Sequence, residues 1–158
     1  MKPQLGDTIL NRYTLVSSLR EEPGIQAWKA NDRVLAKDCQ LFIITNRSAF
    51  AAIDELAGRM AATRPDRVIP VLKYRMESDV LLIVMPVDSG QCLTDYMVDP
   101  AKPLSYSAIR SIIGECANVL REVIADTPSG IVITTDTVRV TTSGVQIADA
   151  PCATMLAD

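Results

Sequence analysis

The sequence predicts an α+β fold in which strands dominate the first half of the chain and helices follow. Short runs rich in β-branched and aromatic residues recur between residues 13 and 85, separated by turn-forming residues. Residues 105–124 instead repeat apolar side chains at helical spacing. Near the end, Ser143-Gly144 joins two short runs, around Val138 and Val145, as is typical of a β-hairpin.

The composition is that of an ordinary globular protein and excludes several classes of function. The 158 residues are 48% apolar and 22% charged, which is enough for one sizeable core. The net charge of −3 gives no basic surface for nucleic acid. The longest apolar run, residues 80–87, is too short to span a membrane, and the N-terminus lacks the apolar segment of a signal peptide. We therefore expect a cytoplasmic protein with no membrane segment in this chain and no nucleic-acid partner.

Two residue types limit the chemistry further. The chain has no histidine, which removes every mechanism based on an imidazole base and every His-ligated metal. Its four cysteines, Cys39, Cys92, Cys116 and Cys152, are far apart and never form a C-x-x-C spacing. We expect reduced, mostly buried thiols, and we expect neither a cofactor nor a metal site.

Five strands and one helix are expected in the first half. The strands are expected at residues 13–20, 25–30, 39–44, 68–74 and 80–85, and Pro23-Gly24 marks the turn between the first two. After the third strand, Ser48 is expected to cap a helix that ends at Arg64-Pro65. Its apolar residues share one face: Phe50, Ile53, Leu56, Ala57 and Met60.

The second half is expected to be more helical. A linker at residues 86–90 precedes a short helix at residues 92–97, and Pro103-Leu104-Ser105 introduces the longest helix. We expect the apolar stripe of this helix to belong to the core. The stripe consists of Ile109, Ile112, Ile113, Cys116, Leu120, Val123 and Ile124.

The order of these elements, together with several short motifs, resembles a bacterial Ser/Thr protein kinase. The matching stretches follow the family order along nearly the whole chain: Asn11-Arg12-Tyr13-Thr14-Leu15, Ala27-Trp28-Lys29-Ala30, Leu81-Leu82-Ile83-Val84-Met85, Gly130-Ile131-Val132 and Val145-Gln146-Ile147-Ala148-Asp149. The resemblance implies a kinase N-lobe at residues 1–86, with a five-stranded antiparallel sheet and one helix. Residues 87–158 would form the hinge and a partial C-lobe, with its first helices and a β-hairpin.

The glycine-rich loop of these kinases covers the phosphates of ATP with bare backbone N–H groups. In this sequence its three glycine positions fall on Arg20, Glu22 and Ile25, and Gly24 lies at a non-matching position. Glu21 and Glu22 would also place negative charge over a triphosphate. We expect no nucleotide at this loop.

The phosphate-binding Lys of the family and its partner Glu also lack counterparts. The Lys aligns with Phe42 on the third predicted strand. Counting back from Arg64-Pro65 places the Glu at Glu55, whereas counting from the helix start places it at Ile53. The phase of the apolar stripe favours Ile53. We expect an apolar contact between Phe42 and Ile53 where the family has an ion pair, and therefore no phosphate clamp.

Two acidic residues are left from the catalytic segment. The motif H-R-D-x-x-x-x-N is replaced by a segment about three residues shorter, in which Asp136 is the one acid. We interpret Asp136 as a turn residue and not as a base. Asp149 matches the Mg²⁺-binding Asp of the family, but Ala150-Pro151 replaces the Phe-Gly that follows it. We expect no catalytic residue and no bound metal, and Asp149 is the one candidate metal ligand.

These losses predict a catalytically inactive pseudokinase, because a missing general base alone costs about 10²–10⁴ in rate. The chain looks similar to the degenerate kinase-like domains of actinobacteria, including those attached to MviN-type lipid II flippases. That resemblance implies a protein-binding or regulatory scaffold in bacterial Ser/Thr kinase signalling, with a link to the cell wall by analogy. The alternative is an atypical nucleotide-binding kinase-like protein with little or no phosphotransfer. A third interpretation is an unrelated α+β interaction protein.

We also expect a protein partner. The chain ends at Asp158, soon after Asp149, and the resemblance implies that it is truncated after that position, either as a fragmentary kinase relative or as one piece of a longer protein. The long helix would then need another surface to cover it, either a partner protein or a second copy in a homodimer. The resemblance implies a kinase or a phosphothreonine-reading FHA-domain protein as the partner, and Thr154 is the candidate phosphorylation site.

Overall fold

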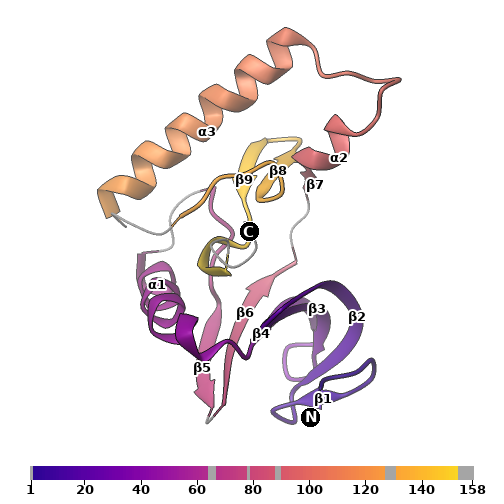
Figure 1. The fold of residues 1–158 in the computed structure, drawn as a ribbon, viewed down its shortest axis with the longest axis vertical. Coiled ribbons are helices and arrows are strands. Elements are labelled where there is room, and N and C mark those ends of the chain that lie inside the picture. The colour runs from indigo at the N-terminus through magenta and orange to yellow at the C-terminus, as the bar shows by residue number, and fades with distance from the viewer. Residues whose placement is uncertain (1, 64–66, 78, 88–89, 127–130, 153–158) are drawn as a thin grey trace. The chain divides into compact units, whose positions relative to one another are not determined.

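The computed structural model describes residues 2–63, 67–77, 79–87, 90–126 and 131–152. Contacts between Cα atoms divide the chain into two compact units (Figure 1), Met1–Ala61 with Pro70–Val87 and Ala62–Ile69 with Asp88–Asp158. The division predicted from the sequence falls after residue 86, so it differs from the observed one mainly in the segment Ala62–Ile69. Some expectations lie outside the described residues: the helix end at Arg64-Pro65, Gly130, the side chains of Val123 and Ile124, and the candidate Thr154.

The first unit is built on an antiparallel sheet with the strand order β1-β2-β3-β4-β6-β5. Its strands are β1 Thr8–Ile9, β2 Tyr13–Glu22, β3 Ile25–Asp32, β4 Lys37–Ile44, β5 Lys73–Glu77 and β6 Val80–Pro86. The short β1, which pairs with the start of β2, is not among the predicted strands. The predicted strand at residues 68–74 begins only at Lys73, because Val68 forms a parallel bridge with Ile147 in the second unit.

Both faces of this sheet are buried at β4, which explains the continuous apolar run of that strand. Leu41 and Ile43 belong to a cluster on one face, whose other buried members are Tyr13, Leu15, Trp28, Ala30, Cys39, Leu82 and Val84. Phe42 and Ile44 alternate with them and are also fully buried, so they face the opposite side. Helix α1, Phe50–Thr63, lies beside β5. A Cβ added at Gly58 would be 3.0 Å from the Tyr74 hydroxyl of β5.

The start of α1 differs from the sequence prediction. A 3₁₀ turn, η1 (Arg47–Ala49), precedes the helix, and the Asn46 side chain caps it by accepting a hydrogen bond from the Ser48 backbone N–H at 3.2 Å. The Ser48 hydroxyl also donates to Asn46 Oδ1, at 2.7 Å. The prediction that Ser48 is the cap is therefore wrong by two residues, because the extra 3₁₀ turn moves the first unpaired N–H groups towards the N-terminus.

The second unit combines two helices with a small antiparallel sheet in the order β7-β8-β9. Its elements are β7 Gln91–Cys92, α2 Leu93–Met97, α3 Tyr106–Asp126, β8 Val138–Thr141, β9 Gly144–Ile147 and the 3₁₀ turn η2 Ala150–Cys152. Ser105 caps α3 by accepting from the Ala108 N–H at 3.1 Å. Hydrogen bonds between Ile69 and Ile147 and between Ile147 and Arg67 attach residues 67–69 to β9.

The apolar stripe of α3 is less buried than expected. Ile112, Cys116 and Leu120 of the stripe are half-buried, and Val119, which is not part of the predicted stripe, is buried. Ile109 and Ile113, however, are 42% and 62% exposed. The prediction that the whole stripe belongs to the core is wrong at these two positions, because only one edge of the stripe is covered in the described part of the chain. Of the helices that the structure describes, none combines the length and hydropathy that a membrane span requires.

Candidate functional site

The three positions expected at the glycine-rich loop lie on the β2–β3 hairpin. Glu22 and Ile25 face each other at its end, and Arg20 pairs with Ala27. The connecting turn is Pro23-Gly24, with Gly24 at φ +81°, as a two-residue turn with glycine second requires. A Cβ at Gly24 would lie 2.8 Å from the Cβ of Asn46. The Gly24 carbonyl accepts hydrogen bonds from the N–H groups of Thr45 and Asn46, so the turn is tied to the end of β4.

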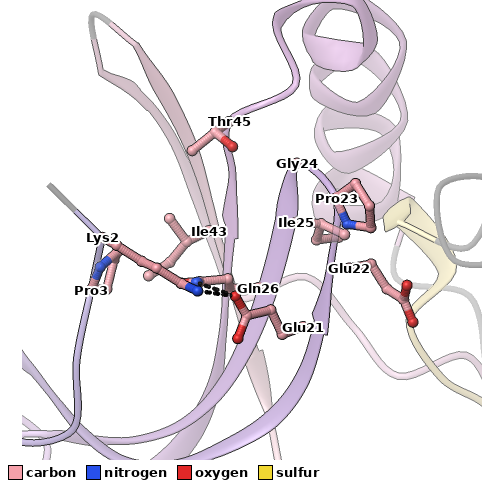
Figure 2. A pocket seen from close by; sticks show the side chains of 10 residues that line it. All are labelled: Lys2, Pro3, Glu21, Glu22, Pro23, Gly24, Ile25, Gln26, Ile43 and Thr45. Carbon is pink, nitrogen blue, oxygen red and sulfur yellow. Dashed lines mark hydrogen bonds and ion pairs between the residues drawn. The ribbon is translucent and has the colours of Figure 1, made fainter.

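Charged side chains surround this hairpin. Arg20 Nε lies 3.4 Å from Glu22 Oε1. Glu21 forms an ion pair with Lys2, and its hydrogen bond with Lys2 lowers the pKa of the Glu21 carboxyl. Figure 2 shows Lys2 reaching Glu21 beside Gln26, at a hollow of about 550 Å³. The hollow is lined by two carboxylates and one ammonium group, an arrangement that offers a phosphate group no net positive charge.

The positions expected to hold the Lys–Glu pair are apolar and buried. Phe42 lies on β4 between β3 and β6 and is 1% exposed, and Ile53 on α1 is 2% exposed. The other placement of the helix acid, Glu55, is exposed and pairs with Arg59 one turn further along α1. Phe42 and Ile53 are therefore packed in the interior of the first unit, whereas Glu55 forms an ion pair on its surface.

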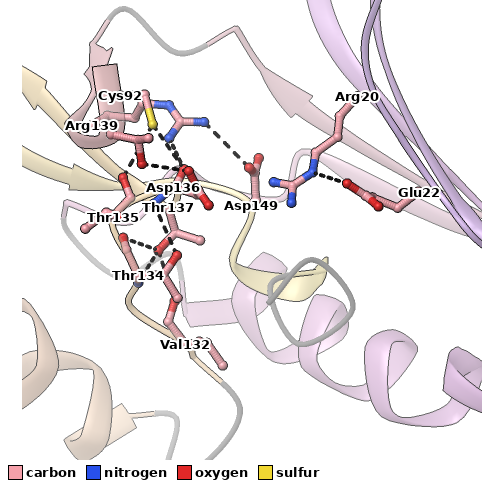
Figure 3. Close-up of polar contacts among 11 residues, drawn as sticks. Arg20, Glu22, Cys92, Val132, Thr134, Thr135, Asp136, Thr137, Arg139 and Asp149 are labelled. Carbon is pink, nitrogen blue, oxygen red and sulfur yellow. Dashed lines mark hydrogen bonds and ion pairs between the residues drawn. The ribbon is translucent and has the colours of Figure 1, made fainter. Parts of the chain in front are cut away.

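Asp136 lies in a tight turn of the second unit (Figure 3). The buried Thr137 closes the turn, because its hydroxyl accepts from the Thr134 N–H at 2.9 Å and lies 3.2 Å from the Val132 carbonyl oxygen. The Asp136 carboxylate accepts a hydrogen bond from the Thr94 hydroxyl of α2 at 2.7 Å. These contacts place Asp136 as a turn residue attached to α2.

Asp149 is buried two residues after β9. Its exposure is 8%, and its backbone is left-handed at φ +57°. Its carboxylate oxygen Oδ2 lies 3.6 Å from the guanidinium of Arg139 on β8. Arg139 also donates a hydrogen bond to the Asp136 carbonyl oxygen. Arg139 belongs to no motif in the sequence, where it lies between Val138 and Val140; only the strand register reveals its contact with Asp149.

The four cysteines are free thiols, two of them buried and two half-buried. Burial raises the pKa of Cys39 to about 11, and burial together with the nearby Asp149 raises the pKa of Cys152. The Cys92 thiol donates weakly to the carbonyl oxygens of Thr135 and Asp136, at 3.4 and 3.5 Å. A raised pKa keeps a thiol protonated and unreactive at neutral pH. Within the described residues, no group of three His, Cys, Asp or Glu side chains could hold a metal ion.

The sequence matches no model of a known protein family and no curated protein. Solved structures match the fold. The kinase domain of Mycobacterium tuberculosis PknI, in a mutant form, aligns with a TM-score of 0.79 at 16% identity over 96% of this chain. The apo form of PpkA-294 aligns with a TM-score of 0.79 at 12% identity over 95% of this chain. The chain spans 63% and 62% of the length of these two proteins. It therefore has a protein kinase-like α+β fold, with a curled antiparallel N-lobe sheet and a few C-lobe helices and a hairpin.

Proposed function

We propose that this chain is a catalytically inactive kinase-like protein, a pseudokinase, that acts by binding other proteins. The observation that carries the proposal is the pair of buried apolar side chains, Phe42 and Ile53, at the positions where the resemblance places the phosphate-binding Lys and its Glu. Phosphoryl transfer depends on positioning and on neutralising the charge of the phosphates. A phenyl ring and a butyl group neutralise none of it.

The hairpin supports the same proposal. Hydrogen bonds to the Gly24 carbonyl attach its turn to the end of β4. Glu22 places a carboxylate at a position where the family has glycine. A carboxylate beside a triphosphate is repulsive, most strongly where water is partly excluded. The backbone N–H cradle that binds phosphates is therefore replaced by a charged, closed hairpin.

A thermal-shift titration with ATP, ADP and Mg²⁺ tests the proposal. A ligand that binds only the folded state raises the melting temperature, by the equivalent of about 2.7 kcal/mol at a hundred times Kd. We expect no shift at millimolar nucleotide. A Mg²⁺-dependent shift would contradict the proposal and favour the atypical nucleotide-binding protein, and its loss in Asp149→Asn would place the nucleotide beside that residue. Mg²⁺ alone at the same ionic strength is the control.

The exposed part of the α3 stripe supports a protein partner. Ile109, Ile113 and Met97 line a mostly apolar hollow of about 490 Å³ between α2 and α3. Arg110 and Arg121, both exposed, are eleven residues apart and so lie within about 20° of each other around the helix, on one side of the stripe. We propose that the partner presents an apolar segment flanked by carboxylates. Two copies packed antiparallel would instead oppose these arginines, which is repulsive.

The nature of that partner rests on the resemblance. An FHA-domain protein reading phosphorylated Thr154, or an active Ser/Thr kinase, is the partner that a scaffold in bacterial kinase signalling would bind. The cytoplasmic location and the relation to the cell wall stay predictions of the sequence.

A further inference from the structure

Arg139 and Asp149 form a nearly buried ion pair in the second unit. Their side chains are 15% and 11% exposed, and Arg139 Nη2 lies 3.6 Å from Asp149 Oδ2. Arg139 lies on β8, the central strand of the three-stranded sheet, opposite Cys92 on one side and Gln146 on the other. Figure 3 shows its guanidinium directed at both the Asp149 carboxylate and the turn that contains Asp136.

A buried carboxylate needs a positive charge beside it, because its ionised form loses the stabilisation of water. In kinases of this fold, that charge at the matching Asp is a bound Mg²⁺. A divalent cation needs several oxygen ligands at short distances. Here the guanidinium contacts two of the available oxygens, Asp149 Oδ2 and the Asp136 carbonyl oxygen. The residues present therefore do not fit a metal ion.

We infer that Arg139 is the resident cation of Asp149 and occupies the place of a divalent metal ion. The inference deepens the proposed function and rests on it for the assignment of Asp149. The positive charge beside the carboxylate comes from a side chain of the same unit, 3.6 Å away, so no metal ion is needed to balance the charge at this position. Removing the guanidinium takes away its contacts with one carboxylate oxygen and one carbonyl oxygen, the ligand types that Mg²⁺ and Mn²⁺ prefer. Arg139 thus excludes divalent metal ions from the Asp149 carboxylate.

Mn²⁺ binding, measured by the EPR signal of the free ion, tests this inference without nucleotide. The proteins are the wild type, Arg139→Gln, Arg139→Gln/Asp149→Asn, Asp149→Asn and the conservative Arg139→Lys. Arg110→Gln, which removes an exposed arginine from α3, is the matched control. We expect Arg139→Gln to bind Mn²⁺ at least about tenfold more tightly than the wild type, a difference of about 1.4 kcal/mol. The double variant, Arg139→Lys and Arg110→Gln should bind no more tightly than the wild type.

Two results would overturn the inference. One is a folded Arg139→Gln protein, with the circular dichroism of the wild type, that binds Mn²⁺ no better than the double variant. The other is a wild-type chain that binds Mn²⁺ and loses it in Asp149→Asn. If Arg139→Gln does not fold, this second comparison decides alone, since equal Mn²⁺ binding by wild type and Asp149→Asn supports the inference. The nucleotide titration tests the proposed function separately, so the proposed function and this inference can fail independently.

Discussion

The Asp32 carboxylate in the first unit accepts hydrogen bonds from both a side chain and the backbone. Arg12 donates two hydrogen bonds to its carboxylate, at 2.8 and 2.7 Å, and the N–H groups of Val34 and Leu35 donate at 3.0 and 3.3 Å. The hydrogen bond from Arg12 is the main cause that lowers the pKa of Asp32 to about 2. Bidentate, charge-assisted geometry of this kind is worth more than an exposed ion pair.

Neutralising Asp32 should therefore destabilise the protein in a pH-dependent way. We expect Asp32→Asn to lower the free energy of unfolding by about 2 kcal/mol at pH 7. Because the folded pKa is lowered, the wild type has this contribution above the unfolded pKa and loses it as pH falls through the folded pKa. The difference between the two proteins in urea unfolding should thus shrink from about pH 4 to about pH 2.

Asp38→Asn is the matched control, because Asp38 forms an exposed ion pair with Lys29. It should change the free energy of unfolding by less than about 1 kcal/mol. An equal effect of the two substitutions would contradict the prediction.

The sequence alone identifies some residues of the candidate site and misses Arg139, because the contact of Arg139 depends on strand pairing. Phe42, Ile53 and Glu22 stand out because each differs in charge or size from what a motif requires. Arg139 has no motif, and its role arises when the register of β8 and β9 brings it to a residue ten positions away. Local patterns identify side chains that differ from a motif, whereas a contact made from another strand becomes visible only in three dimensions.

At the scale of elements, the β2–β3 hairpin makes a quantitative prediction. Gly24→Ala should destabilise the protein by more than about 1 kcal/mol, because alanine strains the backbone at φ +81° and its Cβ meets Asn46. Gly6→Ala is the matched control: φ is +87°, but nothing lies within 4 Å of the added Cβ. The excess cost at Gly24, measured by urea unfolding, gives the cost of the clash between the added Cβ and Asn46. Equal costs at the two glycines would contradict the close approach of the turn to Asn46.

The boundaries of helices and strands are predictable where neighbouring residues set them and not where distant residues do. Pro23-Gly24 and the capped start of α3 at Ser105 were predictable, because turn chemistry and capping act over a few residues. The cap of α1 moved from Ser48 to Asn46, and the start of β5 moved to Lys73. In the second case the deciding interaction, the Val68–Ile147 bridge, joins residues far apart in sequence.

For the whole molecule, the fold class was predictable from the order of the elements, but the solvent exposure of α3 was not. Periodicity shows that a helix has an apolar face and does not show what covers that face. Val119 is buried, whereas Ile113 on the same helix is 62% exposed. The two positions therefore should respond differently to substitution.

We expect Ile113→Asp to change the free energy of unfolding by less than about 0.5 kcal/mol, as at other exposed positions. Val119→Ala should cost about 2 kcal/mol, because it leaves a cavity in packed surroundings. Urea unfolding of both variants measures these values, and sedimentation velocity of the same samples measures their oligomeric state. A monomeric wild type agrees with a partner protein at the α3 stripe, since no second copy then covers the exposed isoleucines. A wild-type dimer that Ile113→Asp dissociates would instead assign the stripe to a second copy, despite the opposed arginines.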